Sequence, residues 1–491
     1  MRDRRVLLHV LILAVFVGAL FVALKVGETD DGRGDRRTIL ELQRTLIEVI
    51  RMTRDYYYKE VDEKKMMEGA IRGALAALND PYTFYQSPED RKREQENLFR
   101  AQFGGVGIRI YEDKGYIKIA MVLPDTPAMR AGLQAGDIIL KVDGKSAIVG
   151  PETGLTINDV VDMLRGEPNT PVTVTIQRRG RAEPFDVTII RDVIKIESVR
   201  YKMLEDGIGY VWITSFTGRT EEEFAKAIED LKKRGLKALI LDLRWNTGGL
   251  LSAAKAIADA FLSEGVIVST KGRREEFNNV FLADENVLVP PEVDVVVLVN
   301  EVTASGAEIV AGAIKDNKRG VLLGTKTFGK GVVQERFALR SGGAISLTIS
   351  RYYTPSGVCI DGTGITPNII VEQPKLDDVQ AAMREKLRES GIVEDFVISY
   401  IESVEKRTGK TPKDFKPLEK KLPELMRKLK ERGIELDEEI VKLEMRRVFD
   451  LNVGISRIVD LETDVQLRKA IEVIKSGMIA RALSSEEPIK L

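Results

Sequence analysis

A serine and a lysine lie in two short motifs whose side chains could together carry out acyl transfer. Ser305 opens the segment Ser-Gly-Ala-Glu308, and Lys330 stands between two glycines in Thr-Phe-Gly-Lys-Gly. A serine hydroxyl becomes an effective nucleophile when a neighbouring base removes its proton, and a neutral lysine amine can be that base. Neutrality near pH 7 requires the lysine pKa to fall by about three units, which costs roughly 4 kcal/mol and calls for burial. The apolar neighbours that could provide this burial are Phe328, Val332 and Val333.

Both residues also have an ordinary structural explanation. Ser305 and Glu308 have the spacing of a capping box, in which a serine satisfies N–H groups at the start of a helix. Lysine is usually a solvated surface charge, and the chain has 75 lysines and arginines. The same helix N-terminus would place unpaired N–H groups beside a negative oxygen, as catalysis requires. Ser305 alone does not decide between these explanations, but Lys330 favours catalysis, because its flanking glycines let the backbone approach closely.

The histidine content restricts the chemistry. His9 is the only histidine, and it lies in residues 6–24, an uncharged apolar segment long enough to cross a bilayer as a helix. Ser-His-Asp and Cys-His catalysis and histidine-dependent metal sites are therefore excluded. Serine with lysine, a pair of carboxylates, or no catalysis remain. For the carboxylate pair, Asp242 has no obvious acidic partner, and we expect it to make a structural hydrogen bond in a buried strand.

Residues 1–27 are predicted to anchor the chain in a membrane. Arg2, Arg4 and Arg5 precede the apolar segment, so the positive-inside tendency leaves the N-terminus in the cytoplasm and the catalytic part on the periplasmic side. Residues 24–28 provide no small-x-small cleavage site. We therefore favour an uncleaved single-pass anchor over a cleaved signal peptide.

Composition narrows the class of protein further. A length of 491 residues suggests about three domains, and 43% hydrophobic with 31% charged residues is typical of a globular chain. The 75 basic residues nearly cancel the 76 acidic ones, so nothing indicates a nucleic-acid partner. Cys359 is the only cysteine, so the fold must depend on core burial rather than on an internal disulfide.

The elements that must position Ser305 and Lys330 alternate between strand and helix across residues 194–375. The apolar run 293–299 predicts a buried strand, so Ser305 falls where a strand passes into a helix, a place where α/β enzymes often carry a nucleophile. This alternation predicts a mainly parallel sheet covered by helices. The other expected strands are 209–213, 238–243 and 321–323, and the other expected helices are 221–234 and 250–262.

A glycine-rich turn and a patterned run mark another domain, residues 101–193. The run is Ala131-Gly-Leu-Gln-Ala-Gly-Asp-Ile-Ile-Leu140, and a helix is expected at 157–165. This combination resembles a PDZ domain. The resemblance implies that a protein tail adds as an extra strand while backbone N–H groups of the turn bind its terminal carboxylate. The residues of that turn are Gly105, Val106, Gly107 and Ile108.

Two helical regions flank these domains. Residues 28–100 carry apolar stripes at helical spacing, which predict a small helical bundle packed on a neighbour. Residues 376–491 are charged and helical, and their apolar positions suggest docking on the core or on a second subunit. The sequence leaves open a homo-oligomer formed through these terminal helices.

Three separated motifs are recognisable in the α/β part. They are Leu241-Asp-Leu-Arg-x-Asn-x-Gly-Gly249, Thr303-Ala-Ser-Gly-Ala-Glu308, and Thr-Phe-Gly-Lys330-Gly followed by Gln334. Together with the PDZ segment and Asn79-Asp80-Pro81, they resemble the serine-lysine carboxyl-terminal processing peptidases, also called tail-specific proteases, over residues 39–374. The resemblance implies a multi-domain α/β fold with a membrane anchor helix, a helical segment, a PDZ domain, a serine peptidase core and a helical C-terminal extension.

The resemblance also implies a role for each motif residue. It makes Ser305 the nucleophile, Lys330 the general base and Gln334 the residue that orients the lysine. The backbone N–H groups of Gly249 and Gly306 would form the oxyanion hole. The four-residue step from Lys330 would leave the two side chains on one face of a strand, because the side-chain period is two. No metal or cofactor is needed for this chemistry.

The implied function is that of an anchored serine endopeptidase that binds C-terminal tails of proteins and hydrolyses peptide bonds through an acyl-enzyme. In relatives the PDZ domain often gates the protease, so Arg165 at the end of the groove helix is a candidate to sense docking. A helix-terminal arginine also simply favours the helix dipole. The alternative function is a non-catalytic PDZ adaptor on an inactive peptidase fold. Whether a separate adaptor protein takes part is left open.

Two residues depart from the pattern of that family. Thr247 stands where the family usually has proline, and Asn368 stands where it has aspartate after Pro367. The first departure could alter the turn that carries Gly249. The second is expected to be local.

Overall fold

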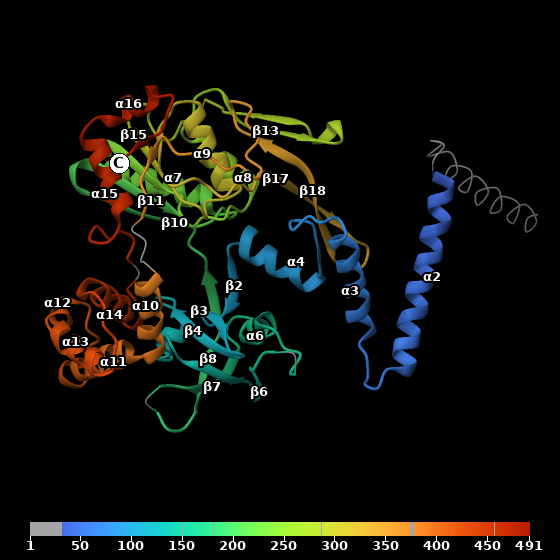
Figure 1. Ribbon diagram of the computed structural model, residues 1–491, viewed down its shortest axis with the longest axis horizontal. Helices are drawn as coiled ribbons and strands as arrows, with labels where there is room; N and C mark the ends of the chain where they lie inside the picture. Colours follow the sequence, from blue (N-terminus) through green and yellow to red (C-terminus); the bar gives the residue numbers. More distant parts are fainter. Residues whose placement is uncertain (1–31, 151, 180, 286, 374–377, 456) are drawn as a thin grey trace, which may run out of the picture. The chain divides into compact units, whose positions relative to one another are not determined.

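The computed structural model describes residues 32–491 apart from 151, 180, 286, 374–377 and 456 (Figure 1). The chain divides into two compact units between Tyr85 and Gln86. The predicted membrane anchor, residues 6–24, lies outside the described residues. Among the residues that are described, no helix combines the length and the apolar character needed to cross a bilayer.

The first unit consists mainly of two helices, α2 (Gly32–Tyr56) and α3 (Glu63–Ala76). Both helices were expected from their apolar spacing. Their stripes are largely uncovered, however: Ile39 is 54% and Leu42 is 63% exposed, and α3 has no buried side chain. The apolar stripes are therefore not buried in the described part of the chain, as a compact bundle would require. Strand β1 (Phe84–Gln86) spans the division between the units.

The peptidase-like core of the second unit is a seven-stranded sheet with the order β10-β11-β12-β15-β16-β19-β20 (Figure 1). β10 pairs antiparallel with β11, and each later neighbour pairs in parallel. The predicted parallel sheet is therefore present, with one antiparallel edge strand. The strands are β10 (Val199–Met203), β11 (Ile208–Ile213), β12 (Ala238–Asp242), β15 (Asp294–Val299), β16 (Val321–Gly324), β19 (Ile369–Ile370) and β20 (Ile489–Lys490).

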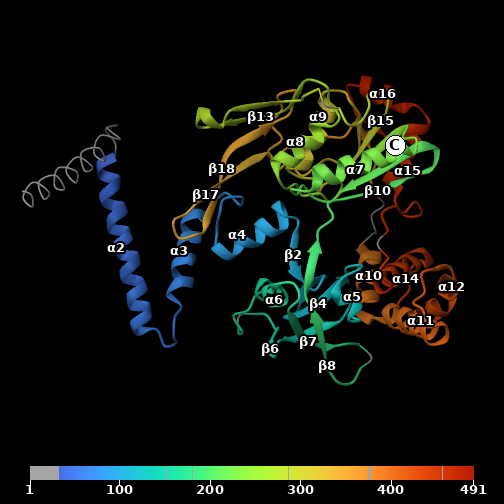
Figure 2. The same ribbon diagram turned by 180° about the vertical axis from the view of Figure 1, so that it is seen from behind.

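Helices cover both faces of this sheet, because its central strands are apolar on both sides. In β15, Val295, Val297 and Val299 face one hydrophobic cluster, while Val296 and Leu298 face another. The first cluster includes α7 (Thr220–Lys233), α8 (Leu251–Asp259) and α9 (Gly306–Asp316). The second includes α15 (Val465–Lys475) and α16 (Met478–Ser484), which lie across the sheet from α7–α9 in Figures 1 and 2. The last part of the chain is thus built into the core.

A smaller antiparallel sheet adjoins the core. β17 (Val332–Ala338) pairs with β18 (Ala344–Tyr353), which pairs with β13 (Val266–Gly272), and β13 pairs with β14 (Asn279–Leu282). The loop that contains Lys330 runs from β16 of the large sheet into β17 of the small one. Two short 3-10 turns, η2 (Glu205–Gly207) and η3 (Glu275–Phe277), lie in the connections.

A separate hydrophobic core supports the PDZ-like part of the chain. β3 and β4 form a hairpin whose turn, Lys114-Gly115, has positive φ at both residues, as the sequence suggested. β2 pairs with β9 at the base of this domain. The elements are β2 (Gln102–Gly105), β3 (Ile108–Asp113), β4 (Tyr116–Val122), α5 (Pro127–Arg130), β5 (Ile138–Val142), β6 (Lys145–Ser146), α6 (Ile157–Leu164), β7 (Pro171–Gln177), β8 (Phe185–Ile190) and β9 (Asp192–Lys195); α4 (Pro88–Glu94) and the π-helix η1 (Gln95–Phe99) precede them.

The predicted C-terminal helical extension divides into two parts. Five helices form a subdomain with its own hydrophobic cluster, and the chain then returns to the large sheet through α15 and β20. The subdomain also contacts the PDZ-like domain, where Arg179 pairs with Asp395 at 3.0 Å. Its helices are α10 (Asp378–Ser390), α11 (Ile392–Thr408), α12 (Lys416–Glu419), α13 (Leu422–Glu431) and α14 (Glu438–Asn452).

Candidate active site

Ser305 occupies a strained turn between β15 and α9. Its φ of 57° and ψ of −118° lie in a region that residues with a side chain rarely adopt, and such strain is commonly retained at functional sites. The predicted strand and helix are both present on either side of it. The preceding residue is also fixed, because the Ala304 N–H donates to the carbonyl of Asn246 at 2.9 Å. The turn therefore holds the serine at the edge of the sheet from which α9 departs.

The carboxylate of Glu308 joins the two predicted catalytic motifs. Its Oε2 atom accepts hydrogen bonds from the backbone N–H groups of Ser305 and Lys330, both at 2.9 Å. Its Oε1 atom accepts from the Gly329 N–H at 2.8 Å and from the Thr327 hydroxyl at 2.6 Å. Because one oxygen atom binds both backbones, the structure brings the Ser305 and Lys330 positions together across 25 residues of sequence.

Burial makes this carboxylate electrostatically unusual. Glu308 is fully buried, and burial raises its pKa, while the four donors act in the opposite direction. The sequence analysis had treated Glu308 only as the last residue of a capping box, and the Ser305 N–H bond is the carboxylate half of that motif. Its contact with the lysine loop was missed. The Ser-x-x-Glu spacing was the signal, but it does not reveal the second loop.

Lys330 and Gln334 are not arranged as a single regular strand. Lys330 precedes β17, and the pairing of β17 with β18 shifts register between Val333 and Gln334. The premise that one strand runs from Lys330 to Gln334 is therefore wrong, because Lys330 lies before β17; the extra residue at the register shift, Ile349, belongs to β18. The Gln334 side chain donates to the Val332 carbonyl at 3.4 Å. Its role in orienting the lysine stays a prediction.

The expected apolar surroundings of Lys330 are only partly present. Val332 is buried, and Val333 packs against the main core. Phe328, by contrast, is 58% exposed. Its backbone is tied to the serine loop, since the Phe328 N–H donates to the Thr303 carbonyl at 3.0 Å. The loop is thus well anchored, while its aromatic side chain faces solvent.

Gly248 and Gly249 bring a third segment against the serine. Their φ values are 102° and 141°, which favour glycine. A Cβ at Gly248 would lie 2.8 Å from the Ser305 Cβ, and one at Gly249 would lie 2.1 Å from the Phe216 carbonyl oxygen. Gly306 is close too, with 3.7 Å between its ideal Cβ position and the Gly248 Cα. The structure therefore gathers Ser305, Gly306 and the glycine turn, while the oxyanion roles of Gly249 and Gly306 stay predictions.

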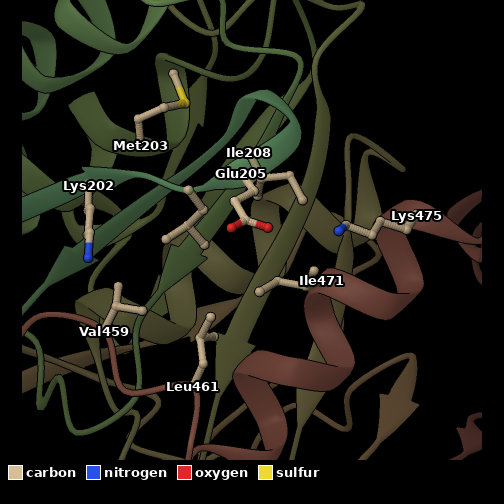
Figure 3. A pocket seen from close by; sticks show the side chains of 9 residues that line it. Lys202, Met203, Glu205, Ile208, Val459, Leu461, Ile471 and Lys475 are labelled. Atoms are coloured by element: carbon tan, nitrogen blue, oxygen red, sulfur yellow. The ribbon is translucent and has the colours of Figure 1, made fainter.

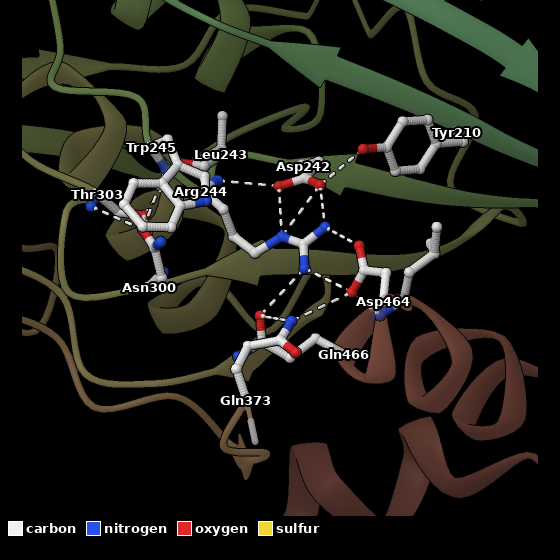
Figure 4. A network of polar contacts seen from close by, with 11 residues as sticks. Tyr210, Asp242, Leu243, Arg244, Trp245, Asn300, Thr303, Gln373, Asp464 and Gln466 are labelled. Carbon is white, nitrogen blue, oxygen red and sulfur yellow. Dashed lines mark hydrogen bonds and ion pairs between the residues drawn. The ribbon is translucent and has the colours of Figure 1, made fainter. Parts of the chain in front are cut away.

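A buried ionic network anchors the start of that turn (Figure 4). The guanidinium of Arg244 bonds to Asp242 and to Asp464, each at 2.6 Å. Asp242 also accepts from the Tyr210 hydroxyl at 2.7 Å, so the structural hydrogen bond expected of it is confirmed. No acidic partner of Asp242 was expected from the sequence, and Asp464 was not among the predicted site residues. Nothing in the local pattern could reveal it, because Asp464 lies 220 residues from Arg244.

The predicted PDZ–protease coupling residue, Arg165, follows α6 directly. Its guanidinium lies 4.1 Å from the ring centre of Phe103, donates to Asn97 at 3.1 Å and approaches Glu96 at 3.7 Å. These last two residues belong to η1, whose Leu98 carbonyl accepts from the Gly218 N–H at 2.7 Å. Arg165 therefore contacts the segment that connects the PDZ-like domain with the sheet.

The predicted carboxylate-binding turn lies between β2 and β3. Gly107 has a φ of 86°, and a Cβ there would lie 2.3 Å from the Thr126 Cβ. The Val106 carbonyl accepts from the Ala128 N–H at 2.9 Å, and the Gly107 carbonyl accepts from the Leu123 N–H at 2.9 Å. Gly105 ends β2 and Ile108 begins β3, so the predicted turn is rigidly held by its carbonyl groups.

A cavity of about 470 Å³ lies elsewhere on the second unit (Figure 3). Residues of β10, η2 and α15 contribute to its wall, including Met203, Glu205, Ile471 and Lys475. None of the predicted site residues lines it. It is therefore separate from the serine turn.

Three family models match the chain: peptidase family S41 over residues 207–371, the PDZ domain over 118–178, and the N-terminal domain of the activating protease CtpB over 27–90. The carboxy-terminal-processing protease of Bartonella bacilliformis is 40% identical over 365 residues, which cover 73% of this chain and 81% of that protein. The chain belongs to peptidase family S41. It is a serine-type carboxy-terminal processing protease with a PDZ domain.

Further similarity extends along this S41 peptidase. The carboxy-terminal processing protease CtpA of Bacillus subtilis is 33% identical over 429 residues, covering 86% of this chain and 88% of that protein. The solved photosystem II D1 C-terminal processing protease is 28% identical, with coverage of 67% of this chain and 93% of the other and a TM-score of 0.42. The segment containing Asp464 lies beyond the residues matched by the S41 family model.

Proposed function

We propose that this S41 peptidase is a membrane-anchored endopeptidase that binds protein C-terminal tails through its PDZ domain and cleaves them with Ser305 and Lys330. The observation that carries the proposal is the shared Glu308 oxygen, which holds the backbones of both residues. A direct backbone bond, from the Phe328 N–H to the Thr303 carbonyl at 3.0 Å, also joins the two motifs.

The proposed reaction is acyl transfer through a covalent ester. The neutral Lys330 amine accepts the hydroxyl proton while the Ser305 Oγ attacks the peptide carbonyl. The N–H groups of Gly249 and Gly306 stabilise the resulting oxyanion. The lysine ammonium then protonates the departing amine, and a water molecule, activated by the neutral amine, hydrolyses the acyl-enzyme. Gln334 orients the lysine.

A peptide carrying a free C-terminal tail tests this chemistry. Ser305→Ala and Lys330→Ala are each expected to lower kcat roughly a thousandfold or more, because the nucleophile or its base is lost. The matched control is Lys326→Ala, which changes an exposed lysine four residues before Lys330. Cleavage that survives both substitutions contradicts the dyad. Tail binding without cleavage by the unaltered chain supports the adaptor alternative.

Docking of a tail on the PDZ domain is proposed to act on the peptidase through Arg165. The contacts that support this route run from Arg165 to η1 and from the Leu98 carbonyl to Gly218, which lies two residues after Phe216. Phe216 in turn donates to the Gly248 carbonyl at 3.0 Å. Arg165→Ala is expected to lose stimulation by a tail peptide and to keep basal hydrolysis. Arg181→Ala, which removes a PDZ-domain arginine stacked on Phe185, is the control.

Anchoring and assembly complete the proposal. The uncharged segment 6–24 supports a membrane span, and Arg2, Arg4 and Arg5 before it support an N-terminus in the cytoplasm and a catalytic part on the periplasmic side. The exposed stripe of α2 supports pairing with a second copy. An adaptor protein is a further partner to be sought in membranes with the trapping variant Ser305→Ala, whose bound proteins would be identified by their C-termini.

A further inference from the structure

We propose that Asp464 is a positioning residue for the active site: through Arg244 it fixes the turn 244–249, which presents Gly249 beside Ser305. The inference rests on the proposed function, since it concerns how the oxyanion turn is held. Asp464 lies outside the region matched by the S41 family model, which ends at residue 371. It enters the core only after the helical subdomain.

Two carboxylates bind the guanidinium of Arg244 along adjacent edges and share one of its terminal nitrogens (Figure 4). Asp242 accepts from Nε at 3.0 Å and from one terminal nitrogen at 2.6 Å. Asp464 accepts from both terminal nitrogens, at 2.8 and 2.6 Å, and the Gln466 Oε1 accepts from one of them at 3.1 Å. Arg244 is only 8% exposed, so these partners take the place of water. Such fork-like contacts fix a plane as well as a distance.

Charge explains why the second carboxylate matters. Burial lowers the pKa of Arg244, but Asp242 and Asp464 outweigh it and hold the pKa above its ordinary value. Burial likewise raises the pKa of Asp464, and the bonds from Arg244 bring it below its ordinary value. Both groups therefore stay ionised. Removing the Asp464 charge leaves terminal guanidinium N–H groups buried with a weaker partner.

The arginine is directly connected to the serine turn. Its own N–H donates to Asp242 at 2.9 Å, which fixes the start of the turn. Two residues later the Asn246 carbonyl accepts from the Ala304 N–H at 2.9 Å. Gly248 then packs against the Ser305 Cβ. Gly248 and Gly249 follow Arg244 in the same short turn, so a displacement of the Arg244 backbone also displaces these two glycines.

The other side of the network is equally rigid. Asp464 is the N-cap of α15 and accepts from the Leu467 N–H at 2.9 Å. α15 packs on the large sheet through Leu467, Ala470 and Val473, which are at most 1% exposed. Next to it, Gln466 donates to the Val371 carbonyl at 2.8 Å. The network therefore joins the turn 244–249 to a helix that is itself packed on the large sheet.

Asp464→Asn tests the inference in the full chain. It keeps the shape of the side chain and removes its charge. Glu472→Gln is the matched control, because it also removes one carboxylate charge from α15 but changes an exposed side chain that pairs with Lys469. For hydrolysis of a tail peptide, kcat is expected to fall about 10- to 100-fold for Asp464→Asn with KM nearly unchanged, because the lost positioning acts in the transition state. A rise confined to KM, with kcat unchanged, would assign the residue to substrate binding and overturn the inference.

A fluorescence measurement separates this inference from the proposed function. Trp245 lies in the turn itself and is 64% exposed, and the chain has only one other tryptophan, Trp212. In a Trp212→Phe background, Asp464→Asn is expected to lower the anisotropy of Trp245 and increase its quenching by acrylamide. Unchanged anisotropy and quenching overturn the inference, whether or not the chain hydrolyses peptides. If the unaltered chain does not hydrolyse peptides, but Asp464→Asn still makes Trp245 more mobile, the positioning inference is supported and only the proposed function is contradicted.

A second variant guards against simple unfolding. Asp464→Glu keeps the charge and adds one methylene, which displaces the carboxylate, so it is expected to change the anisotropy and kcat in the same direction as Asp464→Asn but by less. Chemical denaturation of each variant checks that the folded state is populated. If Asp464→Asn does not fold, Asp464→Glu decides. A folded Asp464→Glu variant with a more mobile Trp245 and a reduced kcat supports the inference. Anisotropy and kcat equal to those of the unaltered chain overturn it.

Discussion

Glu308 shows at the scale of one residue how a buried carboxylate can hold two loops. Four donors share its two oxygen atoms, and all four come from the serine turn or the lysine loop. An amide of the same shape has one acceptor oxygen and two N–H donors. In Glu308→Gln, the NH2 group would therefore face donors that now bond to a carboxylate oxygen. Each buried donor left without an acceptor costs about 1–3 kcal/mol.

We expect Glu308→Gln to lower kcat at least about tenfold, since a displacement of the two motifs that costs about 1.4 kcal/mol in the transition state already has that effect. Steady-state hydrolysis of a tail peptide measures it. Glu301→Gln is a suitable control, because it changes an exposed carboxylate just before the serine turn. Equal kcat values for the two variants would mean that the shared oxygen has no part in positioning.

The pH dependence of the same residue has a definite sign. Burial raises the Glu308 pKa in the folded chain, so the folded state binds this proton more tightly than the unfolded state. The stability contributed by the group is thus greatest at low pH and falls as pH rises from the unfolded pKa through the folded pKa. The activity should instead rise with pH over this range, because only the ionised carboxylate accepts all four hydrogen bonds.

We therefore expect kcat to fall as the pH is lowered. The fall should begin at a pH above the unperturbed pKa of a glutamate, which is about 4.3. A pH profile of kcat for the unaltered chain and for Glu308→Gln measures this. The acidic limb assigned to Glu308 should be missing from the variant. Its persistence there would attribute the limb to another group.

At the scale of elements, regular patterns were predictable and irregular ones were not. The strand β15 and the helix α9 follow from an apolar run and a capping spacing, and both lie where the sequence indicated. The relation of Lys330 to Gln334 was not predictable in this way, because Lys330 lies in the loop before β17 rather than in the strand. Local periodicity thus located the serine but could not orient the lysine.

The glycine turn supports a prediction at this scale. Gly249→Ala places a methyl group where the Phe216 carbonyl oxygen lies 2.1 Å away, so the turn or its neighbour must move. We expect kcat to fall at least about tenfold, equivalent to about 1.4 kcal/mol of transition-state stabilisation. The readout is the rate of Ser305 acylation by a p-nitrophenyl ester, followed by the release of p-nitrophenolate.

The control for that substitution is Gly136→Ala. Gly136 also has positive φ, 89°, but its ideal Cβ meets no atom within 4 Å. It should show only the conformational cost of alanine in this region, about 1–2 kcal/mol of stability, with acylation unchanged. If both variants acylate at the same rate, the close approach at Gly249 does not govern the site.

At the scale of the whole molecule, the peptidase core is assembled from distant parts of the chain. The alternation of strands and helices predicted the central strands β11, β12, β15 and β16, but not the outer strands β10, β19 and β20, nor that α15 would cover the second face of the sheet. That helix carries charged residues between apolar ones, a pattern equally compatible with a separate bundle such as α10–α14. Only the packed structure distinguishes the two.

We expect Leu467→Ala to lower the free energy of unfolding by about 2–5 kcal/mol, because this fully buried side chain fills the interface between α15 and the sheet. Denaturant titration measures the loss, and hydrogen exchange of β15 amides locates it in the core. Glu472→Ala removes an exposed side chain from the same helix and should change stability by less than about 1 kcal/mol. An equal loss in both would show that α15 is not part of the core.

The arrangement of Asp464 has a consequence for how the protein is made. A ribosome that has completed β19 must still translate the subdomain α10–α14 before α15 emerges, so one face of the sheet remains uncovered until late in synthesis. Domains otherwise fold in the order in which they leave the ribosome. The residue that anchors the glycine turn is therefore made late, after the serine and the lysine. If Asp464 positions the turn as proposed, a chain that has not yet incorporated α15 should hydrolyse peptides more slowly than the finished protein.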